Sequence, residues 1–207
     1  IGTRLLQAAI GLPERVATIR LDATPAGLAV YRKLGFAEEY ELSRQETRVA
    51  ERISCEDAGA ARRMTEGDLD EVCALDAPVF GAERRAMLHW MREGSPEYAW
   101  VLPGAKGAAG YCLGRRGFDF HHLGPIVAES PAAARQLLVA CLREQVGTPF
   151  LVDAPALPSD ASRGGWLQTI ADLGFREQRR LTRMFLGAHP FPGQPEKQFA
   201  ILGPEFG

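Results

Sequence analysis

The 207-residue sequence lacks the features that mark several classes of protein. No apolar run approaches the ~20 residues needed to span a bilayer. Lys and Arg number 24 against 26 Asp and Glu, so there is no excess of positive charge to hold a nucleic-acid backbone. Hydrophobic residues make up 46% of the chain, which argues against disorder. We therefore expect a globular protein with no membrane span and no nucleic-acid partner.

Cysteine is scarce as well. The four residues are Cys55, Cys73, Cys112 and Cys141, and no two of them form a CxxC pair, so no zinc or other metal site is expected. The adjacent His121 and His122 would point to opposite faces of a strand, which favours separate structural roles over a shared metal. No export signal precedes the first predicted helix, so we expect reduced thiols and a cytoplasmic location.

The first 47 residues carry the pattern of a helix followed by a strand, a second helix and a second strand. Apolar periodicity and turn residues place these elements at 3–10, 16–21, 26–34 and 36–47. The turn before the second helix contains Asp22, for which helix capping is favoured over substrate binding. Residues 48–60 are polar and small, and we expect them to form a linker.

A fuller set of elements follows this linker. Strands are predicted at 62–64, 98–102, 109–117, 121–128, 149–153 and 175–186. Helices are predicted at 65–75, 82–93, 131–146 and 164–173, the first of them introduced by the capping-box spacing of Thr65 and Asp68. Residues 187–207 are rich in Pro and Gly, and we expect an extended tail over a surface that covers Ile201, Leu202 and Phe206.

The sequence contains an internal repeat. The pattern LGFxExxxL[ST]R begins at Leu34 and again at Leu173, 139 positions later. Leu-Asp-Ala at 21–23 is echoed by Val-Asp-Ala at 152–154, and Thr-Arg-Leu-Leu at 3–6 by Arg-Gln-Leu-Leu at 135–138. The order of helix, strand, helix, LGF and strand thus occurs twice. The first repeat lacks everything before its helix, which fits a truncated first domain.

These segments resemble the GCN5-related N-acetyltransferase (GNAT) family, and in particular its tandem members. Residues 1–6 look like the last two positions of the acyl-CoA motif [QR]-x-x-G-x-[GA] running into a helix, and residues 21–36 look like the later strand, helix and YxKLGF segment. The resemblance implies a mixed α/β acyl-CoA N-acyltransferase fold in tandem. Its parts would be the C-terminal half of a first domain (1–47, the first repeat), a linker (48–60), a second, degenerate domain (61–186, the second repeat) and a tail (187–207).

The resemblance also implies a site in the first repeat. Ile1, Gly2, Thr3 and Arg4 would lie at the acetyl-CoA pyrophosphate, because a glycine lets the backbone approach closely and a helix N-terminus offers free N–H groups. Taken alone, Gly2 is equally a helix-start glycine. Tyr31 would donate a proton to the departing CoA thiolate, and the alternative is a ring packed under the sheet with its hydroxyl in solvent.

The second repeat departs from this motif. Glu129 stands where Gln or Arg begins the motif, Pro131 removes an N–H, Ala132 replaces the first glycine, and Ile170 stands opposite Tyr31. This repeat is therefore expected to complete an acceptor pocket or to act as a scaffold. Six residues are candidates for a pocket wall, with core packing favoured for each: Trp90, Trp100, Phe118, Phe120, His121 and His122. For Arg115 and Arg116, a solvated strand end is favoured over contact with an acidic substrate or with the 3′-phosphate of CoA.

The function implied is transfer of an acetyl group from acetyl-CoA to the amine of a small molecule or peptide. The amine would attack the thioester directly in a ternary complex, with the first domain catalytic. The alternative is a non-catalytic module of the same fold that senses a ligand or binds a partner. The sequence identifies neither the acceptor, nor the general base, nor the oligomeric state.

Overall fold

The computed structural model describes residues 2–11, 16–48, 58–157 and 165–206. The first repeat consists of α1 (Gly2–Gly11), β1 (Thr18–Ala23), α2 (Pro25–Lys33) and β2 (Ala37–Arg48). All four elements match the predicted ranges to within two residues. Thr24 caps α2, because its Oγ1 accepts a hydrogen bond from Gly27 N at 3.3 Å. The capping role favoured for Asp22 is therefore wrong.

The rest of the described chain contains seven strands and four α-helices. The strands are β3 (Arg62–Arg63), β4 (Trp100–Gly104), β5 (Gly107–Arg115), β6 (His121–Ala128), β7 (Pro149–Ala156), β8 (Arg176–Gly187) and β9 (Gln198–Ala200). The helices are α3 (Leu69–Phe80), α4 (Arg85–Gly94), α5 (Pro131–Leu142) and α6 (Trp166–Asp172). The predicted capping box is confirmed, and it introduces a short 3-10 turn from which α3 continues past Leu75 to Phe80.

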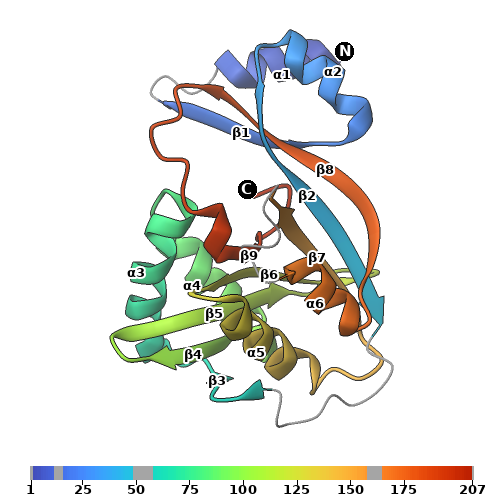
Figure 1. Cartoon of the computed structure of the whole chain (residues 1–207). Helices are drawn as coiled ribbons and strands as arrows, with labels where there is room; N and C mark the ends of the chain where they lie inside the picture. Colours follow the sequence, from blue (N-terminus) through green and yellow to red (C-terminus); the bar gives the residue numbers. More distant parts are fainter. Residues whose placement is uncertain (1, 12–15, 49–57, 158–164, 207) are drawn as a thin grey trace.

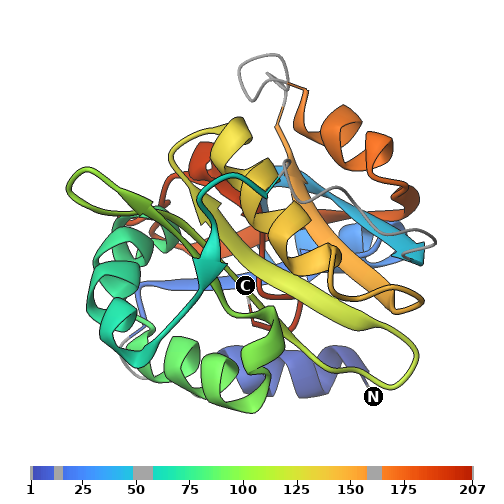
Figure 2. The same cartoon turned by 90° about the horizontal axis from the view of Figure 1, so that it is seen from below.

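The strands form one sheet in the order β1-β8-β2-β7-β6-β5-β4-β3, with β9 paired to β6. The predicted mixed α/β fold is confirmed. The two repeats do not form two separate sheets, so the division into domains stays a prediction. Helices α3 and α4 lie on one side of the sheet and α5 and α6 on the other, and an apolar core fills each side (Figure 2).

The last strands of the two repeats are exchanged. β8, from the second repeat, pairs antiparallel with β1 and β2 of the first, and β2 pairs in turn with β7 of the second. In Figure 1, β2 and β8 run side by side from the upper part, formed with α1, α2 and β1, into the larger lower body. The repeated LGF segments therefore feed strands that bind the opposite repeat, and each repeat completes the sheet of the other.

Two buried ion pairs follow this exchange. Asp22 of the first repeat accepts two hydrogen bonds from Arg183 of the second, at 2.9 and 3.0 Å. Asp153 of the second repeat accepts two from Arg44 of the first, at 2.7 and 2.8 Å. The aspartates are the repeated Asp-Ala residues and the arginines end the repeated L[ST]R, so the internal repeat encodes the same bidentate pair twice.

The C-terminal segment is part of the sheet. β6 and β7 pair in parallel only at their first residues and then diverge, and β9 lies between them. Ile201 N donates to Asp153 O of β7 at 2.9 Å, and Trp166 Nε1 donates to Phe199 O at 2.8 Å. Ile201 and Leu202 are fully buried, whereas the predicted tail would have lain over a surface. The diverging strands leave backbone groups that need partners, and β9 supplies them.

Candidate functional site

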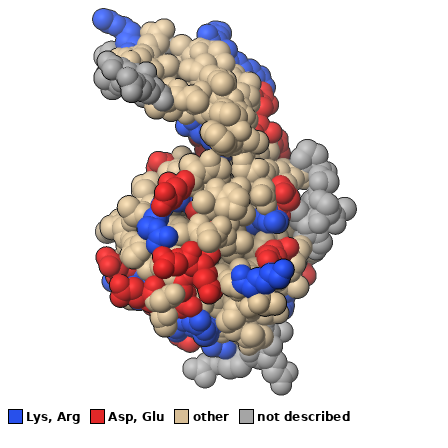
Figure 3. Space-filling model, turned by 90° about the vertical axis from the view of Figure 1, so that its left-hand side faces the viewer, with Lys and Arg blue, Asp and Glu red and all other residues tan. Residues whose placement is uncertain are grey.

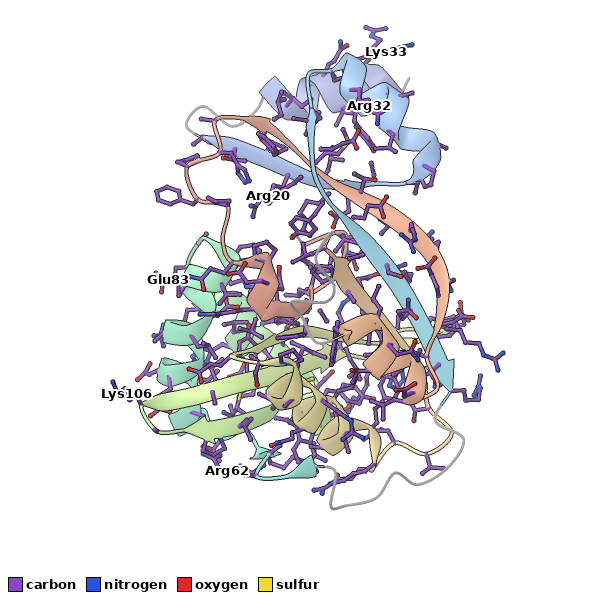
Figure 4. All side chains as sticks on the ribbon, viewed as in Figure 1. Arg20, Arg32, Lys33, Arg62, Glu83 and Lys106 are labelled. Atoms are coloured by element: carbon purple, nitrogen blue, oxygen red, sulfur yellow. The ribbon has the colours of Figure 1, made fainter. Side chains whose placement is uncertain are left out.

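Strand β1 separates two environments. Ile19, Leu21 and Ala23 pack on one face in an apolar cluster that includes residues of α1 and α2. Because side chains alternate along a strand, Arg20 and Asp22 face the opposite side. Figure 4 shows Arg20 below β1, on the side of the lower body. One face of β1 is therefore structural, and the other places two charged side chains between the upper and lower parts.

A cavity of about 230 Å³ lies at this second face. Arg20, Leu21 and Asp22 line it from β1, and Arg183 from β8. The lower body adds Phe80, at the end of α3, and residues 204–206 of the C-terminal segment. Figure 3 shows the surface indented between the upper part and the larger body. The cavity thus lies between the repeats, where binding sites occur preferentially.

The charges of the cavity walls are largely paired. Asp22 and Arg183 are each 1% exposed, and Arg183 Nη1 also donates to the Tyr40 hydroxyl at 2.9 Å. Burial raises the pKa of Tyr40, so this hydroxyl stays protonated. Arg20 Nη2 donates to Glu39 at 2.9 Å and to Pro192 O at 2.8 Å. Both cations are thus held by protein groups.

A chain of polar contacts leads from the buried Asp153 to Glu205 at the cavity. His122 Nε2 lies 2.8 Å from Asp153 Oδ2, and His122 Nδ1 lies 3.0 Å from Arg115 Nη2, which also contacts Glu205. Because arginine only donates, Nδ1 of His122 must accept, so the ring proton is on Nε2. Burial alone would raise the pKa of Asp153, but hydrogen bonds from Arg44 and His122 outweigh it and hold the pKa at about 2.

The residues predicted for cofactor binding and catalysis lie on the other face of β1. Ile1 is outside the described residues, and Gly2, Thr3 and Arg4 form the first turn of α1. Tyr31 is half-buried in the same apolar cluster as Ile10 of α1. Its ring stands edge-on to Phe36 with centroids 5.9 Å apart. The structure therefore brings Tyr31 and α1 together and separates both from the cavity by β1.

None of the six predicted wall residues lines this cavity. Trp100 is buried in the core, Phe118 is fully exposed, and Phe120 is half-buried. His121 and His122 have different partners, as the alternation predicted: His121 stands beside Tyr98, and His122 beside Asp153.

Trp90 is not a lining residue, but its ring lies 6.5 Å from that of Phe206, which lines the cavity. Arg116 is an exposed strand end paired with Glu97, whereas Arg115 is the contact of Glu205.

Sequence reasoning missed most of the cavity lining. Phe80, Glu205 and Phe206 come from segments far apart in the chain, and nothing in their spacing joins them. The polar positions of β1, Arg20 and Asp22, were the available signal.

No helix in the described ranges is long and apolar enough to cross a membrane.

Comparison with known proteins identifies relatives for nearly the whole chain. The model of the acetyltransferase (GNAT) domain matches residues 72–200, a range that ends at the last residue of β9. The chain is 29% identical over 191 residues to the holothin acyltransferase of Pseudoalteromonas sp. (strain SANK 73390), covering 92% of this chain and 62% of that one. It is 25% identical over 156 residues to the uncharacterized N-acetyltransferase YitH of Bacillus subtilis (strain 168), covering 75% and 55%. The chain thus spans only part of each curated relative.

Two solved structures also share the fold of this chain. A protein from Pyrococcus horikoshii assigned to the acetyltransferases superposes over 100% of this chain and 66% of that one, with a TM-score of 0.74 and 26% identity. A GCN5-related N-acetyltransferase from Sphaerobacter thermophilus shares the fold over 94% of this chain and 68% of that one, with a TM-score of 0.60 and 15% identity.

Proposed function

The chain belongs to the GNAT acetyltransferase family, and from this premise we propose that it serves to transfer an acetyl group from acetyl-CoA to the amine of a small molecule or peptide. The first repeat would hold acetyl-CoA, and the second would complete the acceptor pocket and the scaffold. The proposal keeps the tandem division predicted from the sequence. The observation that carries it is a difference between equivalent places in the two repeats. One edge of β1 has no strand partner among the described residues, whereas the corresponding edge of β7 pairs with β6 at its start and then receives a hydrogen bond from Ile201, directly after β9.

The two repeats offer an internal comparison for how an extended ligand would bind. Among the described residues, β1 pairs with β8 alone, so its other edge presents backbone N–H and C=O groups. In the second repeat, Ile201 N donates to the carbonyl of Asp153, which is the counterpart of Asp22. The pantetheine arm of CoA is an extended chain with amide groups. We expect it to lie along β1 as β9 lies along β7.

The start of α5 supports a second repeat without a cofactor. Ser130 caps this helix, and its Oγ accepts a hydrogen bond from Ala133 N at 3.2 Å. Pro131 has no N–H, and Glu129 precedes the cap. A pyrophosphate at this helix would meet a repelling carboxylate and fewer free donors. Together with β9, this favours one acetyl-CoA site per chain.

The first repeat has the groups that the reaction needs on the cofactor side. Acetyl-CoA supplies an activated thioester: the amine nitrogen would bond to its carbonyl carbon as the bond to sulfur breaks, and the nitrogen would release one proton to solvent. The Tyr31 hydroxyl has no hydrogen-bond partner among the described residues, so its proton is free to be donated to the leaving thiolate. The Tyr31 ring lies over Gly27, where an added Cβ would approach it to 2.8 Å. The absence of a side chain at position 27 therefore leaves room for the Tyr31 ring.

Titrating acetyl-CoA into the full-length protein by calorimetry, followed by steady-state kinetics, tests this function. We expect one site per chain, and we expect Tyr31→Phe to lower kcat by about 100-fold or more while the Kd of acetyl-CoA stays unchanged. Lys33→Gln, an exposed change on the same helix, is the matched control and should alter neither quantity.

Two acetyl-CoA sites per chain would contradict the proposal that the second repeat binds no acetyl-CoA. Binding without turnover of any amine would favour the alternative, a ligand-sensing module, and unchanged turnover in Tyr31→Phe would remove Tyr31 from the mechanism.

A further inference from the structure

We propose that the C-terminal turn at residues 203–206 recognises the nitrogen of the acceptor, with the Glu205 carboxylate accepting a hydrogen bond from the amine while the rings of Phe80 and Phe206 flank it. This inference rests on the proposed function, because it names the class of acceptor whose amine would attack the thioester held at the edge of β1. It specifies a small molecule that carries an amine on an apolar body, bound in the cavity beneath β1.

Glu205 is the most exposed of the four charged side chains that line the cavity. The Asp22 carboxylate is 1% exposed, and both of its oxygens accept from Arg183. The Arg20 side chain is 18% exposed and is held by Glu39. The Glu205 side chain is 50% exposed. A carboxylate that faces a cavity and keeps contact with water is suited to accept from an amine at low desolvation cost.

Arg115 holds the Glu205 carboxylate in position. Arg115 binds Oε1 of Glu205 and is the only hydrogen-bond partner of this carboxylate among the described residues, so Oε2 is free to accept from a ligand. The Arg115 guanidinium also stands over the Phe206 ring, 5.5 Å from its centroid, and contacts His122. A hydrogen bond from Phe206 N to Gly203 O at 3.0 Å closes the turn. Arg115 is therefore a positioning residue, anchored through His122 on the buried Asp153.

The aromatic walls match an amine better than an anion. Phe80 and Phe206 both line the cavity, and Phe206 is 38% exposed. Aromatic faces attract ammonium groups and repel anions. The cavity of about 230 Å³ is smaller than the ~300–1,000 Å³ of drug-sized ligand sites, so the bound group is small.

Benzylamine and benzyl alcohol are matched probes for this site, because they differ only in the group offered to Glu205. We expect calorimetry to give at least tenfold tighter binding of benzylamine to the wild-type protein. Glu205→Gln should abolish this preference, and Glu205→Asp should restore part of it. Glu196→Gln is the control: this glutamate is exposed, has no side-chain hydrogen bond or ion pair among the described residues and should keep the full preference.

The fluorescence of Trp90 tests whether the probe binds beside Phe206. Trp90 is 54% exposed and lies beside Phe206, whereas Trp100 and Trp166 are buried, so benzylamine should quench emission that Trp90→Phe removes. Equal affinity for the two probes, or a preference retained in Glu205→Gln, would overturn the assignment. An acetyl-CoA titration of the same proteins keeps the two proposals apart. A protein that prefers benzylamine through Glu205 but binds no acetyl-CoA would contradict the proposed function and leave amine recognition established.

Discussion

Replacing Asp22 by Asn tests whether the ion pair that crosses between the repeats holds the whole chain together. The change keeps the size of the side chain and removes its charge. It leaves the Arg183 guanidinium, which is 1% exposed, with the Tyr40 hydroxyl and one amide oxygen as acceptors. The amide nitrogen at position 22 would also face a guanidinium N–H, and two donors cannot satisfy each other.

The expected loss follows from this burial. Removing one partner of a buried pair costs about 3–5 kcal/mol, because a desolvated charge remains without compensation. The Arg32–Glu38 pair provides the comparison, since its side chains are 58% and 44% exposed and such pairs contribute about 0–1 kcal/mol. Glu38→Gln should therefore change little. The double variant Asp22→Leu with Arg183→Met should lose less than Asp22→Asn, because no unpaired charge is left in it.

Urea unfolding followed by circular dichroism gives the free energy of unfolding of each variant by linear extrapolation. The exchanged strands predict a single transition, since neither repeat can keep its sheet once the other has opened. Asp22→Asn should shift this one transition to lower urea. A loss below about 1 kcal/mol would refute the reasoning about burial. Two separate transitions would refute the claim that the strand exchange makes the repeats one cooperative unit.

Two further predictions concern the second repeat. The pKa of Asp153 lies at about 2 when folded, below its ordinary 3.8, so its ion pair should stabilise the fold by about 2 kcal/mol above pH 4 and lose this contribution as the pH falls toward 2. Unfolding free energies measured between pH 2 and pH 5 should be flatter in Asp153→Asn than in the wild type, and equal slopes would contradict the assignment. Leu202→Ala should cost about 2–5 kcal/mol in thermal or urea unfolding if the C-terminal segment is core, and under about 0.5 kcal/mol if it merely lies on a surface.

The order of elements could be predicted because its signals are local. The strand at 121–128 has the predicted bounds, and the capping box at Thr65 and Asp68 forms as its spacing required. The partners of the strands could not be predicted in the same way. The two LGF segments are so alike that either following strand fits beside β1 or β7, and only the folded chain decides between them. β9 is three residues long in a segment rich in Pro and Gly, too short to carry a periodic signal.

In the candidate site, too, the residues of a local motif could be predicted and those joined only by tertiary packing could not. Tyr31 and the start of α1 were found because one motif spans them, and the structure places α1 and Tyr31 in one apolar cluster. Their roles stay predictions. The cavity is built from β1, the end of α3, β8 and the C-terminal turn, which meet only through tertiary packing. Phe118 shows the converse, since an aromatic residue that the sequence offered as a wall is fully exposed.

The exchange of β2 and β8 has a consequence for the synthesis of this protein on the ribosome. β2 ends at residue 48, but β8, the partner of β1, begins only at residue 176. At roughly 5–20 residues per second, the nascent chain carries β1 without that partner for on the order of 10 s. During this interval an unpaired strand edge is open to other nascent chains on the same message. A chaperone that holds the emerging first repeat would therefore act on it for longer than the length of that repeat alone suggests.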